Sequence, residues 1–100
     1  MPHCILLVQA NKSLASRTYS DYENVKEAMT GVCQMYEAHL REVYPTKTHI
    51  HYEVADLFSF IDALADLSCL VLQPDTLNYK PHDKEWIKAK VYMTLKSMTQ

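Results

Sequence analysis

Hydrophobic residues fill both alternating phases of the strand-like segment Cys4-Ile5-Leu6-Leu7-Val8. Because successive residues of a β-strand point to opposite faces of a sheet, such a strand makes both faces apolar. The phase of positions 4, 6 and 8 contains only apolar residues, whereas the other phase continues into His3 and Gln9. The wholly apolar phase is therefore predicted to lie under helices, which leaves Ile5 and Leu7 on an open face.

Three later segments repeat apolar residues at helical spacing and predict amphipathic helices. The first is expected to begin at Ser20, because Ser20 and Glu23 have the spacing of a capping box, and to end before Pro45. The second is expected to follow Asp56, and the third to start near Asp83. The predicted buried stripes are Val25, Met29, Val32, Tyr36, Leu40 and Val43, then Leu57, Phe58, Ile61, Leu64 and Ala65, and finally Trp86, Ile87, Val91, Leu95 and Met98.

The only glycine of the chain, Gly31, falls within the first helical segment. A glycine there costs about 1 kcal/mol relative to alanine. Its presence predicts a close approach of another element to this helix. Residues 10–19, which precede the helix, have no hydrophobic period and are predicted to form a loop.

Three more strands are predicted from the remaining pattern. Residues 48–54 alternate between apolar and polar, which is typical of a strand with one buried face. Residues 69–73 and 77–80 are predicted to form a hairpin around Pro74. The fold class is therefore α+β, a four-stranded antiparallel sheet with three amphipathic helices on one face, in a single domain of residues 1–100.

The open face of this sheet is expected to bind a second copy of the chain. An apolar patch with a polar rim marks an interface, and symmetric homodimers are the commonest assembly. The first hairpin strand is apolar in both phases as well, so either Cys69 and Val71 or Leu70 and Leu72 extend the patch. The residues assigned to the dimer interface are His3, Ile5, Leu7, Gln9, Cys69 and Val71.

Composition limits the kind of protein further. The chain has 48% hydrophobic and 22% charged residues and a net charge of -2, which is typical of a globular protein and argues against affinity based on neutralising phosphates. No segment of about 20 apolar residues and no leader is apparent. Three cysteines without a CxxC pair predict reduced thiols in an intracellular protein, cytoplasmic, nuclear or both. Lysines concentrate after residue 80, as either a solvated helix face or an anionic partner site.

Motifs for enzymatic chemistry are missing from the sequence. One glycine cannot build a phosphate-binding loop, and neither Gly-x-Ser-x-Gly nor His-Glu-x-x-His occurs, so no catalytic residue and no cofactor is predicted. His49 and His51 share a face of their predicted strand and His3 is a possible neighbour, but this set is too small to predict a metal site. Thr18 has an acid three residues later and is a candidate for phosphorylation.

Several short motifs follow one another in a specific order over nearly the whole chain. They are Ile5-Leu6-Leu7-Val8-Gln9, Arg17-Thr18-Tyr19, Asp21-Tyr22-Glu23, Gly31-Val32-Cys33, Met35-Tyr36-Glu37, Leu57-Phe58, Phe60-Ile61-Asp62, the run from Leu64 to Val71, Asp75-Thr76 and Trp86-Ile87-Lys88. On these motifs the chain resembles the enhancer of rudimentary homolog family.

This resemblance implies a three-helix, four-stranded fold that dimerises through its sheets. It also implies a non-enzymatic adaptor that binds short segments of partner proteins in transcription, RNA elimination or small-RNA processing. The function predicted is a homodimeric adaptor in RNA-processing or gene-silencing complexes, with peptide segments of these proteins as partners and with neither direct nucleic-acid nor membrane contact. The alternatives are a transcription or cell-cycle cofactor with other protein partners, a direct RNA binder or a metal-binding protein.

Overall fold

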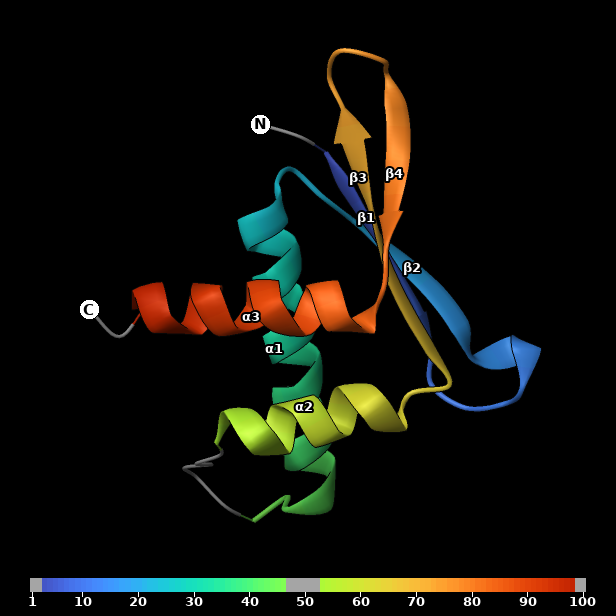
Figure 1. The fold of residues 1–100 in the computed structure, drawn as a ribbon. Coiled ribbons are helices and arrows are strands. Elements are labelled where there is room, and N and C mark those ends of the chain that lie inside the picture. The colour runs from blue at the N-terminus through green and yellow to red at the C-terminus, as the bar shows by residue number, and fades with distance from the viewer. Residues whose placement is uncertain (1–2, 47–52, 99–100) are drawn as a thin grey trace.

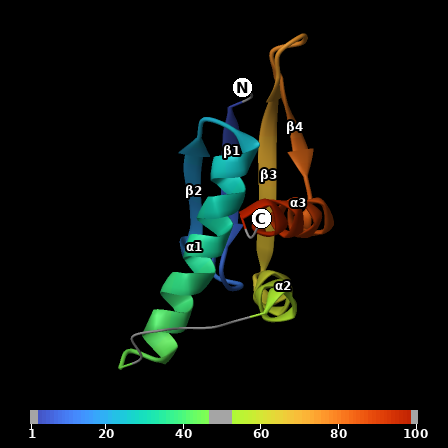
Figure 2. The same cartoon turned by 90° about the vertical axis from the view of Figure 1, so that its left-hand side faces the viewer.

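The computed structural model describes residues 3–46 and 53–98 (Figure 1). The sheet has the order β2-β1-β3-β4, and all neighbouring strands are antiparallel. The three helices lie on one side of this sheet, as the two views in Figures 1 and 2 show. In chain order the elements are β1 (Cys4–Gln9), the 3-10 helix η1 (Leu14–Ser16), β2 (Arg17–Tyr22), α1 (Val25–Val43), α2 (Val54–Ala63), β3 (Asp66–Gln73), β4 (Asn78–His82) and α3 (Lys84–Met98). The predicted α+β class is thus confirmed.

The core lies between the sheet and the helices. Cys4 and Leu6 of β1 are 0% and 3% exposed, so the wholly apolar phase of this strand does face the helices, as predicted. The other residues of the core include Leu67, Cys69 and Val71 of β3, Met29 and Val32 of α1, Leu57 and Ile61 of α2, and Ile87 and Val91 of α3. Burying such a side chain fully stabilises the fold by roughly 1.5–3 kcal/mol.

Strand β2 was not expected, because residues 17–19 were predicted to be loop and residue 20 to start a helix. Its sequence Arg-Thr-Tyr-Ser-Asp-Tyr has no apolar phase, and five of its six residues are exposed. A strand at the edge of a sheet needs little apolar surface, so it gives no periodic signal.

The capping box predicted at Ser20 is wrong, since the helix starts four residues later. Asn24 is the N-cap of α1: its side-chain Oδ1 accepts a hydrogen bond of 2.9 Å from the backbone N–H of Glu27. The Glu27 carboxylate in turn accepts a bond of 3.3 Å from the N–H of Glu23. Asn and Glu three residues apart satisfy amide groups that the first helical turn cannot satisfy itself.

The strand predicted at residues 48–54 falls largely outside the described residues. Its last residue, Val54, is the first residue of α2, so the strand prediction is wrong at that position. Glu53 is the N-cap of α2, and its N–H donates to Asp56 Oδ2 over 3.1 Å. Asp56 therefore lies inside the first turn and does not precede the helix.

The C-terminal half agrees with the sequence pattern. Strands β3 and β4 form the predicted hairpin, and the turn after Pro74 closes with a 2.7 Å bond from Leu77 N–H to the Gln73 carbonyl. Leu77 has a φ of 58°, an uncommon conformation for a residue other than glycine. Helix α3 begins after Asp83, whose carboxylate accepts a 3.0 Å bond from Trp86 N–H.

Two lysines of α3 hold the C-terminal end of α2. The Lys84 ammonium donates to the carbonyl oxygens of Leu64 and Asp62 over 2.6 and 3.2 Å. Lys88 forms an ion pair of 2.5 Å with the Asp62 carboxylate, and this contact raises the pKa of Lys88. Cations are favourable at this end of a helix, where the last carbonyl groups lack helical partners.

Gly31 lies on the side of α1 that meets Tyr22 of β2. A Cβ atom added at Gly31 would lie 2.6 Å from Cζ and 2.9 Å from Cε1 of the Tyr22 ring. The close approach predicted from the glycine is confirmed. It fixes the distance between α1 and the edge strand.

We expect Gly31→Ala to lower the free energy of unfolding by about 1–3 kcal/mol, because the ring of Tyr22 must move. In a Tyr22→Ala background the same change should instead stabilise the protein by up to about 1 kcal/mol, the helix propensity difference between the two residues. Urea unfolding of the four proteins measures both effects. The same sign of the Gly31→Ala effect in both backgrounds would contradict the role assigned to this contact.

The three cysteines are reduced thiols buried in the core. Burial raises the pKa of all three, and that of Cys69 to about 12, helped by the neighbouring Cys4 thiol. A neutral thiol is neither a good nucleophile nor a metal ligand.

Native protein at pH 8 should therefore react with an aromatic disulfide reagent only as fast as it unfolds, because the thiols are both covered and neutral. Full reaction of three thiols per chain is expected in denaturant. Absorbance of the released thiolate measures the rate, and rapid reaction of any native cysteine would contradict this assignment.

Candidate functional site

The face of the sheet away from the helices carries an apolar ridge. Ile5 and Leu7 of β1 point to this face, and so do Leu70, opposite Ile5, and Leu72 of β3. Leu7 is 38% exposed and the other three are half-buried. Among residues 3–46 and 53–98 no helix covers this ridge (Figure 1). In the single chain, these four residues form an apolar strip that is partly in contact with water.

Two tyrosines flank the ridge. Tyr19 of β2 is opposite Leu7 and is 73% exposed, and Tyr79 of β4 is opposite Leu72 and is 40% exposed. Tyrosine combines a large apolar ring with one polar group, and it loses little conformational entropy on binding. The ridge with its two tyrosines is called the open face below.

One end of the open face is closed by a polar contact across the sheet. His3 Nδ1 and the Tyr79 hydroxyl are hydrogen-bonded at 2.7 Å, and the rings meet edge to face with centroids 5.9 Å apart. On its other side, His3 Nε2 lies 4.0 Å from the carboxylate of Asp21. His3 thereby links the first residues before β1 to both edge strands.

The opposite end holds a small hollow of about 300 Å³. Arg17 Nε donates to Gln9 Oε1 over 2.9 Å, and the Gln9 amide donates to the Asn11 carbonyl over 2.9 Å. Leu7 and Tyr19 form the apolar part of its wall. A hollow of this size suits one side chain of a binding partner.

The placement of Cys69 and Val71 on the open face is wrong. They are 0% and 7% exposed, and Cys69 is opposite Leu6 on the helix side of the sheet. Leu70 and Leu72, the other pair considered, lie on the open face. Positions 67, 69 and 71 of β3 are all apolar. The wholly apolar phase therefore faces the helices in β3, as it does in β1.

The other four residues assigned to the dimer interface, His3, Ile5, Leu7 and Gln9, lie on the open face, and their role in a dimer stays a prediction. The loop predicted at residues 10–19 is wrong for Tyr19, which lies on β2 at the edge of this face. Thr18 is exposed on β2, not in a loop, and its phosphorylation also stays a prediction.

His49 and His51 lie outside the described residues, so the interpretation of this pair is not tested. Within the part of the chain that is described, no three His, Cys, Asp or Glu side chains converge as metal ligands. No helix in the same part is long and apolar enough to span a membrane.

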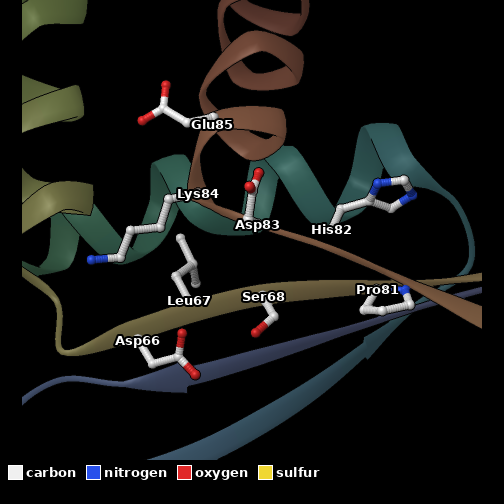
Figure 3. Close-up of a pocket in the computed structure, with 8 residues that line it drawn as sticks. All are labelled: Asp66, Leu67, Ser68, Pro81, His82, Asp83, Lys84 and Glu85. Atoms are coloured by element: carbon white, nitrogen blue, oxygen red, sulfur yellow. The ribbon is translucent and has the colours of Figure 1, made fainter.

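A second groove, of about 620 Å³, lies where β4 leaves the sheet and α3 begins (Figure 3). Its polar groups have structural partners: Lys84 binds the end of α2, and Asp83 caps α3. The His82 ring stacks on Trp86 with centroids 3.9 Å apart, and burial lowers its pKa. Among the described residues that line this groove, no nucleophile is paired with a base.

A third groove, of about 510 Å³, lies beside the start of α1. It is lined by Tyr22 of β2 and by the α1 residues Lys26, Thr30 and Gln34, among others. These α1 residues are spaced by four and therefore form one stripe along the helix. The groove runs along the same side of the molecule as the edge strand β2.

Comparison with known proteins gives consistent matches over the whole chain. The family model described as "Enhancer of rudimentary" matches residues 1–100. The protein enhancer of rudimentary of Drosophila virilis is 50% identical over 96 residues, which cover 96% of this chain and 92% of that protein. The enhancer of rudimentary homolog of Dictyostelium discoideum is 45% identical over 100 residues and 100% of both chains. Enhancer of rudimentary homolog 1 of Schizosaccharomyces pombe is 29% identical over 94 residues, or 92% of this chain and 86% of that protein.

Proposed function

Because this chain belongs to the enhancer of rudimentary family, we propose that it is a homodimeric, non-enzymatic adaptor that captures short segments of partner proteins. The complexes in which it works are those of RNA processing or small-RNA silencing. The observation that carries the proposal is the open face: four aliphatic residues and two tyrosines on the side of the sheet without helices.

In this proposal, a second copy of the chain binds to the open face. Contiguous apolar surface of this kind is unfavourable in water, and burial of about 25 cal/mol per Å² drives association. The polar groups at its ends, His3 with Tyr79 and Arg17 with Gln9, already have partners within the chain. They form a rim whose burial leaves few hydrogen-bonding groups unsatisfied.

Capture of a peptide is the second part of the proposal. A two-fold dimer presents two equivalent grooves, so one segment binds per chain. The grooves beside α1 and at the hollow of Tyr19 have volumes of about 510 and 300 Å³, which accommodate side chains of an extended segment. Segments that are disordered until bound suit shallow grooves of this kind.

The first test is the oligomeric state. Wild type should have the mass of two chains by light scattering at about 10 µM, whereas Ile5→Arg/Leu7→Arg should have the mass of one, because two charges per chain would be buried without partners. The monomer should stay folded, since Cys4 and Leu6 remain under the helices.

The matched control is Leu14→Arg/Val43→Arg. These residues are 67% and 51% exposed and lie off the open face, so this variant should remain dimeric. A wild-type mass of one chain would refute the dimer.

The second test is peptide binding. Partners recovered by pull-down and mass spectrometry supply a segment of about 20–30 residues for calorimetry, which should bind at one segment per chain. Ile5→Arg/Leu7→Arg should weaken binding at least tenfold, about 1.4 kcal/mol, because it separates the two copies and replaces Leu7 in the wall of the hollow. Gln34→Trp should weaken it by filling the groove beside α1, while Ala89→Trp on α3 should not.

If wild type and Ile5→Arg/Leu7→Arg bind the peptide with equal affinity, peptide capture does not depend on the dimer and this part of the proposal is wrong. Tight binding of RNA oligonucleotides at physiological salt would favour a nucleic-acid reader instead.

A further inference from the structure

The two edges of the sheet differ in their free backbone groups. The Leu72 N–H donates to the His3 carbonyl over 2.9 Å, so the odd-numbered residues of β1 direct their backbone groups toward β3. The even-numbered ones point toward β2, where their partners are Thr18, Ser20 and Tyr22. By the alternation of an antiparallel ladder, the N–H and C=O groups of residues 17, 19 and 21 then point away from the sheet.

The other edge strand, β4, is blocked. The backbone groups of residues 78, 80 and 82 point toward β3, so the N–H and C=O groups of residues 79 and 81 point away from the sheet. Residue 81 is proline and has no N–H, which removes a donor in the middle of that edge. Strand β2 contains no proline and no bulge in its pairing with β1. It is the edge that can accept another strand.

The sequence of β2 is complementary to itself in antiparallel order. With Tyr19 placed opposite its own copy, Arg17 is opposite Asp21, and Thr18 is opposite Ser20. Opposite charges, aromatic pairs and hydroxyl pairs are the favourable combinations between strands. This register also places the outward backbone groups of residues 17, 19 and 21 in hydrogen-bonding pairs.

We propose that β2 is a second self-association surface, on which β2 of another copy adds as an antiparallel strand about a two-fold axis at Tyr19. The two four-stranded sheets then become one continuous sheet. The occupant is a second copy, because in antiparallel order the positive charge of Arg17 meets the negative charge of Asp21 at both ends of the strand. This contact uses the outward backbone groups of β2, whereas the dimer of the proposed function uses the aliphatic residues of β1 and β3, so the two contacts can coexist. The short edge contact is the weaker of the two and joins dimers at protein concentrations above that of the light-scattering test.

The test is disulfide trapping on the helix side of β2, away from the open face. Thr18 and Ser20 are both exposed there, and the native thiols are buried. In the proposed register their Cα atoms are about 4.5 Å apart, within disulfide range. Two copies of residue 18 are about 8 Å apart, beyond that range.

Thr18→Cys chains mixed with mass-tagged Ser20→Cys chains should therefore form the mixed disulfide dimer, while either variant alone should not. The product should also form in the Ile5→Arg/Leu7→Arg background, which separates this contact from the dimer of the proposed function. Thr18→Cys mixed with Ser59→Cys, an exposed residue of α2, measures random collision.

Arg17→Asp should reduce the yield at least fivefold, because it places a second carboxylate opposite Asp21 of the other copy. Arg17→Asp/Asp21→Arg should restore it. A yield no higher than the Ser59→Cys control would overturn the proposal. So would an equal yield in Arg17→Asp, or trapping that is lost in the Ile5→Arg/Leu7→Arg background. If the β2 amides are protected from exchange only when a partner peptide is bound, the edge belongs to that peptide and the proposal is wrong.

Discussion

The pairing of β1 with β3 is the contact on which the rest of the structure depends. Leu6 and Cys69 are opposite each other in the centre of the sheet, and both are buried under the helices. A shift of this pairing by one residue would turn every side chain of one strand to the other face. The register of β1 and β3 thus determines both faces of the sheet. Alternate residues of the two strands enter the core, and the residues between them form the apolar ridge of the open face.

Much of this arrangement follows from the pattern of apolar residues. The phase rule orients β1 correctly, and Pro74 and Asp83 mark the turn and the start of α3 where the structure has them. The rule also orients β3, because Leu67 continues the apolar phase of Cys69 whereas Ser68 interrupts the phase of Leu70. The assignment of Cys69 to the open face was wrong because the strand was predicted to begin at residue 69, which left Leu67 and Ser68 out of the comparison of the two phases.

The N-terminal third is harder to predict for a physical reason. An edge strand such as β2 is stabilised mainly by backbone hydrogen bonds to β1, and these leave no trace in the hydrophobic pattern. Ser20 and Glu23 have the spacing of a capping box, but Asn24 and Glu27 have an equivalent spacing and are the ones used. The pairing of β2 with β1, which continues to Tyr22, and the contact of Tyr22 with Gly31 both keep the chain extended up to the start of the helix.

The lysine contacts between α3 and the end of α2 have a consequence for how the protein opens. Lys84 and Lys88 bind Asp62 and Leu64, although β3 and β4 separate the two helices in the sequence. If either helix leaves the sheet alone, the same set of bonds is broken. Segments that share their stabilising contacts open together as one cooperative unit. Helices α2 and α3 are therefore expected to open together, whereas the edge strand β2, which has one neighbouring strand, can fray separately with its preceding loop.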